Sequence, residues 1–316
     1  MPSILSSLGS LCSTLPADRD EKLAGERALP AEQQKAASGR DVSTGTLVVV
    51  PREGLYVSEP DPRMFGNERN PLSGAGWTNK NWLKSRFHFA FAENFSGPGP
   101  YGVLRVMNDD LVQPQRGFGT HPHRDMEIIT FVVQGALTHQ DSMGTSETLG
   151  RGSVQFMTAG TGVRHSEHNL KAGTPLRFIQ SWVVPRQRGL KPNYGSSSGD
   201  GDAAIARRDR WAHVVGDVRA VGGNEAPVRI DQDCNVFVTE LTPGTTSPPL
   251  EIRSDRQAYM LCVEGDIVRG LRGKQLRQHD ATELKGEWTL ELQAGKEGAL
   301  ILLFEMARTA DSRGVH

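Results

Sequence analysis

The sequence has little that would tie it to a membrane, to nucleic acid or to a disulfide framework. Three cysteines, Cys12, Cys234 and Cys262, are scattered through 316 residues without CxxC spacing, so neither paired disulfides nor a thiolate zinc site is expected. The longest apolar runs, such as 299–304, are strand-sized and fall short of the ~20 residues that a membrane span needs. Thirty-six basic and 37 acidic residues leave a net charge of -1, which indicates no electrostatic affinity for nucleic acid or an anionic membrane. We therefore expect a protein of a reducing compartment with a small-molecule or protein partner.

Residues 1–45 differ in composition from the rest of the chain. The first 17 are rich in Ser and Leu and carry no charged side chain, and a charged stretch follows at 18–41. A secretory signal would need a basic start and a continuous apolar segment, and a transit peptide would need arginine, which first occurs at Arg19. We expect a disordered N-terminal extension, with a targeting segment as the alternative.

From residue 46 onwards the pattern predicts an all-β protein with a few short helices. Short β-branched or aromatic runs alternate with Gly, Pro and Asn, as in sandwiches and barrels. The Gly/Ser/Asp-rich stretch at 189–210 interrupts them and is predicted to be a linker. The sequence thus predicts an N-terminal domain at 46–188 and a C-terminal domain of similar texture at 211–310. Weak helix signals occur at 78–84, at 203–210 and at the C-terminus.

Two short segments contain pairs of side chains that suit a metal ion. GFGTHPHRDME at 117–127 holds His121 and His123, and GTGVRHSEHN at 160–169 holds His165 and Glu167. In a strand, residues i and i+2 point to the same face, so each pair can reach one ion, and the turns between the segments can bring the pairs together. Pro122 lacks an N–H, which places the first pair on an edge strand or at a gap in the ladder. An isolated HxH is usually a surface pair, but two such pairs beside glycines favour a metal site.

Three imidazoles and a carboxylate narrow the choice of metal. This ligand set suits iron, zinc, copper, nickel or manganese, and the lack of thiolates argues against structural zinc. Four protein ligands leave an octahedral ion two open positions, which oxygen-activating non-haem iron enzymes use. Iron(II) is the leading choice on chemical grounds, and spacing alone leaves the other divalent metals open.

The two motifs resemble those of the cupin superfamily. HPHRDMEIITFVVQGALTHQDSMG and FMTAGTGVRHSEHN are more specifically similar to the pirin family, in its bacterial quercetinase-like branch, and the resemblance extends over about 47–308. It implies two jelly-roll-like cupin barrels packed face to face, of which only the N-terminal one binds metal.

Matched residue by residue, the resemblance implies that His121, His123, His165 and Glu167 are the metal ligands, and iron is the family's usual metal. In most cupins the carboxylate ligand would instead be the Glu of the first motif, here Glu127. We expect Glu167 as the ligand and Glu127 as a nearby group that orients a ligand histidine.

The family includes proteins with quercetin 2,3-dioxygenase activity. In that case a flavonol would enter the first barrel with its 3-hydroxyl towards the metal, and Glu167 or another base would accept the hydroxyl proton. Dioxygen would then open the heterocycle with loss of carbon monoxide. Other members are nuclear cofactors that bind transcription factors, so the alternative is a redox-sensing binding protein. A third hypothesis is a silent stress protein with a structural metal.

For the remaining features we expect structural roles. His139 and His168 are predicted to lie at the pocket rim or in the structure around it, and His279 on the surface. The second barrel should bind no metal. The extension and an insertion at 195–202 depart from the compact bacterial members and leave localisation open: the cytoplasm is expected, with the nucleus or, through residues 1–45, an organelle as alternatives.

Overall fold

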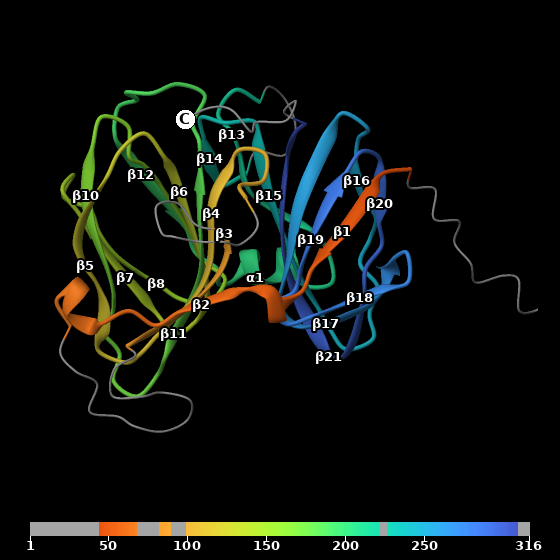
Figure 1. The fold of residues 1–316 in the computed structure, drawn as a ribbon, viewed down its shortest axis with the longest axis horizontal. Helices are drawn as coiled ribbons and strands as arrows, with labels where there is room; N and C mark the ends of the chain where they lie inside the picture. Colours follow the sequence, from red (N-terminus) through yellow and green to blue (C-terminus); the bar gives the residue numbers. More distant parts are fainter. Residues whose placement is uncertain (1–43, 68–81, 90–98, 221–225, 309–316) are drawn as a thin grey trace, which may run out of the picture. The chain divides into compact units, whose positions relative to one another are not determined.

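The computed structural model describes residues 44–67, 82–89, 99–220 and 226–308, and the chain from Asp41 onwards forms one compact unit. Regular structure in these ranges is almost entirely β-strand, and Figure 1 shows the strands gathered into two barrels that pack face to face. The described helices are short, namely two 3-10 turns, η1 (Arg52–Gly54) and η2 (Pro62–Phe65), and α1 (Asp202–Arg207). None of them is long and apolar enough to cross a membrane. The all-β fold with two barrels is therefore confirmed.

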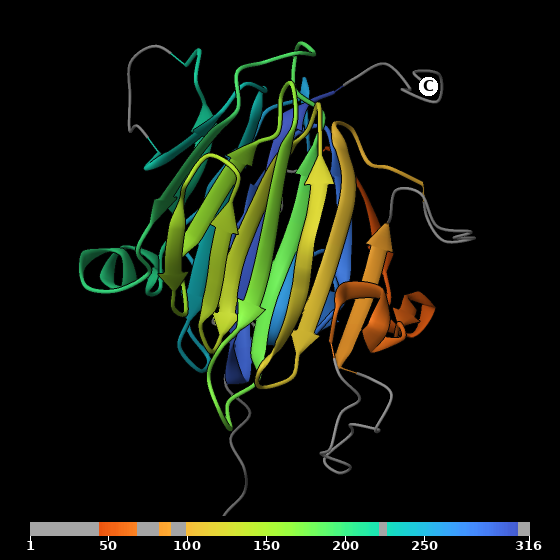
Figure 2. The same ribbon diagram turned by 90° about the vertical axis from the view of Figure 1, so that its left-hand side faces the viewer.

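The first barrel is a large sheet closed by a smaller one, seen from its outer side in Figure 2. In spatial order the large sheet comprises β12 (Asn193–Ser197), β9 (Val154–Thr158), β6 (Glu127–Gln134), β11 (Leu176–Val183), β4 (Leu104–Val112), β3 (Leu83–Phe89) and β2 (Tyr56–Ser58). The small sheet comprises β5 (Arg116–His123), β10 (Val163–Asn169), β7 (Leu137–Asp141) and β8 (Ser146–Leu149).

The second barrel repeats this plan. In spatial order its large sheet comprises β1 (Thr46–Val50), β19 (Ala281–Lys285), β17 (Arg256–Leu271), β21 (Gln293–Ala307), β15 (Cys234–Leu241), β13 (Ala212–Asp217) and β14 (Val228–Ile230), with β18 (Lys274–Arg277) paired to β17. A two-stranded sheet of β16 (Leu250–Ile252) and β20 (Trp288–Leu290) faces it.

The two large sheets bury their outer faces against each other. One apolar cluster contains Phe131 of β6 and Ile179 of β11 together with Tyr259 of β17 and Phe304 of β21. This contact is possible because side chains alternate along a strand, so that one face of each sheet serves the interior of its barrel and the other serves the partner barrel.

The interiors of the two barrels differ in polarity. The second is filled by buried apolar side chains such as Met260, Leu284 and Trp288. The first encloses buried polar side chains, including Asp110, His139 and Glu167. Buried polar groups need partners or a ligand, so the first barrel is the place to look for a functional site.

A buried ion pair of the first barrel, between Arg177 and Asp109, also contacts the second barrel, and His279 takes part in this contact. The Arg177 guanidinium donates to both carboxylate oxygens of Asp109, at 2.8 and 2.7 Å, and to the Val263 carbonyl across the interface at 2.7 Å. Nδ1 of His279 lies 2.6 Å from Asp109 Oδ2, and the side chain is only 15% exposed. The surface position predicted for His279 is therefore wrong. Its φ of 74° lies in the left-handed region, which favours glycine.

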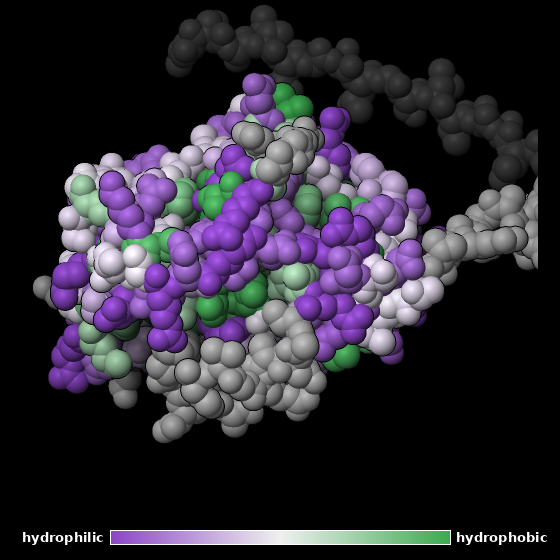
Figure 3. Space-filling view, turned by 90° about the horizontal axis from the view of Figure 1, so that it is seen from above, coloured by the Kyte–Doolittle hydropathy of each residue, from purple (hydrophilic) through white to green (hydrophobic). Residues whose placement is uncertain are grey.

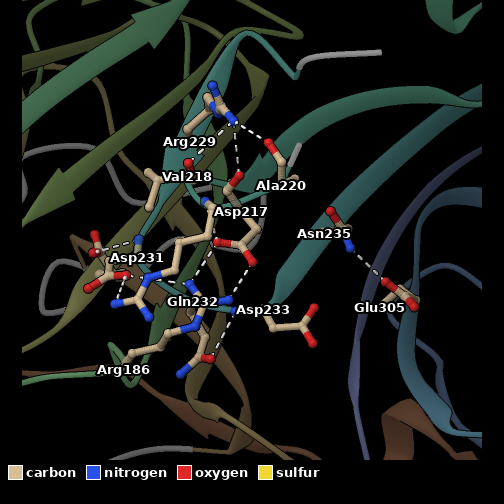
Figure 4. Close-up of polar contacts among 12 residues, drawn as sticks. Arg186, Asp217, Val218, Ala220, Arg229, Asp231, Gln232, Asp233, Asn235 and Glu305 are labelled. Carbon is tan, nitrogen blue, oxygen red and sulfur yellow. Dashed lines mark hydrogen bonds and ion pairs between the residues drawn. The ribbon is translucent and has the colours of Figure 1, made fainter. Parts of the chain in front are cut away.

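A second polar network ties the end of the first half to the second half (Figure 4). Arg186 donates to Asp217 at 2.7 Å and to Asp231 at 3.4 Å. The Asp231 N–H in turn donates to the buried Glu127 of β6 at 3.1 Å. Seen from above, the molecule is mostly hydrophilic, with its hydrophobic residues in separate patches (Figure 3).

Two elements cross the predicted domain boundaries. β1 lies within the predicted N-terminal domain, but it pairs with β19 at the edge of the second large sheet. The predicted linker contains β12, which pairs with β9 of the first barrel, and the short helix α1. The expected helix at 78–84 falls partly outside the described residues, and β3 begins within it at Leu83. The boundaries themselves stay a prediction.

Candidate metal centre

Three histidines converge on the inner side of the small sheet of the first barrel. β5 and β10 are antiparallel neighbours, and their register places His165 directly opposite His121. The ring centroids of His121, His123 and His165 are 4.5 to 4.8 Å apart. One nitrogen from each ring lies within 4.8 Å of the others. The predicted pairing of the two motifs across neighbouring strands is thus what the structure contains.

The free nitrogens of these rings fit a metal ion. Nδ1 of His121 lies 2.8 Å from the Gly119 carbonyl, so this nitrogen carries the proton and Nε2 keeps its lone pair. That Nε2 is 3.1 Å from Nε2 of His165. The buried Nε2 of His123 and Nδ1 of His165 have no hydrogen-bond partner. A cation bound by the three rings would satisfy such lone pairs, whereas three histidines in contact without one would leave them unpaired.

The electrostatics of the site keep the imidazoles of His123 and His165 neutral. Burial lowers the pKa of His123 to about 3, and the neighbouring His165 and His121 add to the shift. Burial and the neighbouring His121 likewise lower the pKa of His165 to about 2. Neutral imidazole is the form that binds metals, so these two rings are ready for ligation throughout the physiological pH range.

Glu167 lies two residues beyond His165 on the inner side of β10, next to a bulge in the pairing with β5. Its carboxylate is buried and accepts hydrogen bonds from Gln180 at 2.8 Å, from Gln155 at 3.2 Å and from Thr130 at 3.4 Å. Among the described residues it forms a second group of candidate ligands with His139 and His165. The four predicted ligands therefore fall into two overlapping groups that share His165.

His139 lies within this cluster of candidate ligands, whereas the sequence predicts it at the pocket rim or in the structure around the pocket. The side chain is fully buried on β7, its ring stacks on Tyr194 with centroids 4.6 Å apart, and Nε2 lies 3.0 Å from Asp141 Oδ2. The i, i+2 spacing of His139 and Asp141 is the same signal that identified the two ligand pairs. This spacing is therefore a signal in the sequence that points to His139 and Asp141 as a third pair on one face of a strand.

Glu127 does not orient a ligand histidine in this structure. Its side chain lies on the outer face of β6, opposite to the residues that face the barrel interior. There it accepts hydrogen bonds from the Thr158 hydroxyl at 2.7 Å and from the Asp231 N–H of the second half. The backbone carbonyl of Gly119 does the orienting of His121 instead. His168 likewise faces away from the site, because its ring packs against Gly117.

The local sequence explains why the strands can approach so closely. A Cβ on Gly117 would lie 2.4 Å from the Glu167 carbonyl oxygen, and one on Gly119 would lie 2.6 Å from the Phe65 carbonyl oxygen. Only glycine fits at either position. β5 is an edge strand paired only to β10, as Pro122 predicts.

A cavity of about 240 Å³ opens beside the histidines, and His121 and His123 form part of its wall. Its aromatic lining comprises Phe65, Phe87, Phe118 and Trp182, and its polar lining includes Ser85, Asn108, Asp110 and Gln180. An apolar pocket with a few convergent polar groups is typical of a small-molecule site. The cavity therefore gives an organic molecule access to the histidine cluster.

Comparisons with known proteins agree with this geometry. The Pirin family model matches residues 70–183, and the model of the quercetinase C-terminal cupin domain matches 219–306. A Pseudomonas aeruginosa relative whose name marks it provisionally as a quercetin 2,3-dioxygenase is 37% identical over 242 residues, covering 76% of this chain and 99% of its own. The quercetin 2,3-dioxygenase of Escherichia coli K12 is 32% identical over 237 residues, covering 73% of this chain and 94% of its own.

Among solved structures, the bacterial pirin YhhW of Escherichia coli in complex with nickel(II) is similar with a TM-score of 0.64 and 27% identity. The match covers 84% of this chain and 100% of the YhhW chain. The long matches at these identities, together with the two family models, leave one assignment: the chain belongs to the pirin family and has its two cupin barrels.

Proposed function

We propose that the chain is an iron-dependent dioxygenase that opens the heterocycle of flavonols such as quercetin, with His121, His123, His165 and Glu167 as the metal ligands. The observation that carries the proposal is the convergence of three imidazoles beside an aromatic-lined cavity, with His121 and His123 in its wall. The names of the Escherichia coli and Pseudomonas aeruginosa relatives support the substrate class. When bound, iron(II) supplies Lewis-acid and redox chemistry at its open coordination positions.

The residues of the chain would bind and orient the substrate. The rings of Phe65, Phe118 and Trp182 provide flat apolar surface for a planar ligand. The three hydrogen bonds to Glu167 fix that carboxylate beside His165, as a ligand requires. The sequence also nominates Glu167 as the base that takes the hydroxyl proton.

The overall reaction consumes one dioxygen per flavonol. The two ring bonds to carbon 3 break, both atoms of dioxygen enter the ring-opened product, and carbon 3 leaves with its own oxygen as carbon monoxide. An open cavity at the histidines supports turnover over the two alternatives, a redox-sensing binding protein and a closed structural site. Nickel is the first metal to compare with iron, because the solved Escherichia coli relative is a nickel(II) complex.

The test is oxygen uptake by iron-loaded protein over a panel of flavonoids, with bound iron measured in the same sample. We expect uptake with flavonols and its loss in His123→Ala. The control is His213→Ala, because His213 lies in the second barrel beside Asn235. Protein that retains iron and consumes no oxygen with any flavonol would refute the proposal.

A further inference from the structure

Two adjacent aspartates of β4, Asp109 and Asp110, have opposite surroundings. Asp109 faces the second barrel and is paired with Arg177 of the neighbouring strand β11. Asp110 faces the inside of the first barrel, is 2% exposed and lines the cavity that His121 and His123 also line. The alternation of side chains along a strand accounts for this difference between neighbours.

The cavity side of β4 carries hydrogen-bonding atoms without partners. Oδ1 of Asp110 and Oδ1 of Asn108 are buried and accept no hydrogen bond. Both residues line the cavity, two positions apart on one face of the strand. Buried polar atoms of this kind are normally satisfied, and a buried acceptor left without a hydrogen bond is destabilising. Their position in a cavity therefore indicates that a ligand completes them.

Glu167 offers a contrast within the same barrel. Its two oxygens already accept three side-chain hydrogen bonds, so what remains of its capacity serves the proposed metal and the hydroxyl proton and not further hydrogen bonds to an organic ligand. Oδ1 of Asp110, by contrast, has no hydrogen-bond partner and can accept one from a ligand. The polar contacts of a bound molecule should therefore fall on the Asp110 side of the cavity.

We propose that Asp110, with Asn108 beside it, is the specificity-determining group of the cavity: it hydrogen-bonds the hydroxyl-bearing edge of a planar aromatic ligand and selects hydroxylated ring systems over bare ones. This inference rests on the proposed function for its ligand class. The aromatic walls accept any flat ring system, so the discrimination must come from the polar atoms.

The protonation of Asp110 suits this role. Burial raises the pKa of its carboxyl to about 8 against the opposing effect of the Ser85 hydroxyl, and the charges of Asp109 and Glu167 add to the rise. A neutral carboxyl both donates and accepts a hydrogen bond. It can therefore pair with a hydroxyl, or with a hydroxyl and its neighbouring carbonyl. A site built on buried hydrogen-bonding groups rejects an analogue that lacks the matching group strongly.

The experiment compares the affinities of quercetin and unsubstituted flavone, which share one ring system and differ in their hydroxyl groups. Binding to the full chain is followed under nitrogen by quenching of tryptophan fluorescence, so no turnover is needed. We expect wild-type protein to prefer quercetin. The preference should fall roughly tenfold in Asp110→Asn, which replaces one carboxyl oxygen by an NH2 group that cannot accept a hydrogen bond, and further in Asp110→Leu. Asp202→Asn on α1 is the exposed control and should leave the preference unchanged.

The outcomes separate this inference from the proposed function. Preferences equal to wild type in both folded Asp110 variants would overturn the role of Asp110, whatever the enzyme does with oxygen. If Asp110→Leu fails to fold, Asp110→Asn and Asn108→Leu decide alone, and an unchanged preference in both overturns the inference. A selective, Asp110-dependent preference in a protein that consumes no oxygen would uphold Asp110 and refute the dioxygenase.

Discussion

His121 and His165 lie opposite each other on β5 and β10, with their Nε2 atoms 3.1 Å apart. Since His121 Nδ1–H donates to the Gly119 carbonyl, the Nε2 atom of His121 keeps its lone pair and points it at His165. His123 completes the cluster from the next inward position of β5. The metal-binding predictions rest on this contact.

Replacing a ligand histidine should abolish metal binding without unfolding the chain. In His165→Ala we expect bound metal, measured by elemental analysis of protein purified without chelators, to fall to background. The reason is that two imidazoles and a carboxylate bind a metal ion far more weakly than three imidazoles and a carboxylate. His213→Ala serves as the control. Wild-type metal content in His165→Ala would place the ion elsewhere.

Glu167→Gln tests the carboxylate. The substitution keeps the shape but removes the charge, and its amide would meet the donors of Gln155 and Gln180. We expect metal affinity, measured by competition with a chelator, to fall by at least roughly tenfold. If Glu127→Gln lowers the affinity as much and Glu167→Gln does not, the ligand is the Glu of the first motif.

The buried pair between the barrels should be a major contributor to stability. Arg177→Met leaves Asp109 charged and buried, which costs about 3–5 kcal/mol. Denaturant unfolding should show this loss. The matched control is Arg253→Met, which breaks an exposed pair with Asp255 and should change the free energy of unfolding by less than about 1 kcal/mol. Equal effects in the two variants would contradict a central role for the Arg177 pair.

The acid sensitivity of the fold should depend on His88. Burial lowers the pKa of this fully buried histidine from 6.5 to about 4, so the unfolded chain binds the proton more readily than the folded one. The contribution of His88 to stability is therefore complete above pH 6.5 and is lost as the pH falls from there towards about 4.

His88→Gln removes that titration and keeps a polar partner for the Tyr259 hydroxyl, which lies 2.9 Å from His88. Between pH 7.5 and pH 5, about 2 kcal/mol less stability should be lost in the variant than in wild type. Urea unfolding at the two pH values measures the difference. Parallel losses in both proteins would show that other groups set the acid limit.

The contact of Gly117 with β10 predicts a site-specific effect of a single methyl group. In Gly117→Ala the new Cβ would lie 2.4 Å from the Glu167 carbonyl oxygen, which forces β5 and β10 apart. We expect weaker metal binding and lower thermal stability. Gly54→Ala is the control, because a Cβ there meets nothing within 4 Å. A tolerant Gly117→Ala would mean that the strands can separate without disturbing the histidines.

Local spacing was enough to predict the histidine cluster and its edge strand. The i, i+2 rule places His121 with His123, and Pro122 predicts the exposed ladder of β5. Both follow from the geometry of a single strand. The same rule cannot say which face of a strand lies inside a barrel. The resemblance to the cupin motif places Glu127 near the site, although in this fold it faces the second half.

Contacts between segments that are far apart in the chain could not be predicted from the sequence. His279 lies 170 positions from Asp109, and only the packing of the barrels brings them together. β1 pairs with β19 for the same reason. The different fates of Asp109 and Asp110 follow from strand alternation, but only the tertiary structure shows which of them faces the cavity.

The central claim is that the cluster of His121, His123 and His165 supports oxygen-dependent ring opening. The most direct measurement is carbon monoxide released against dioxygen consumed by iron-loaded protein supplied with quercetin. We predict equal amounts of the two gases, at a rate proportional to bound iron. Iron-replete protein that releases no carbon monoxide, or releases it at the same rate after His123→Ala, would contradict the account.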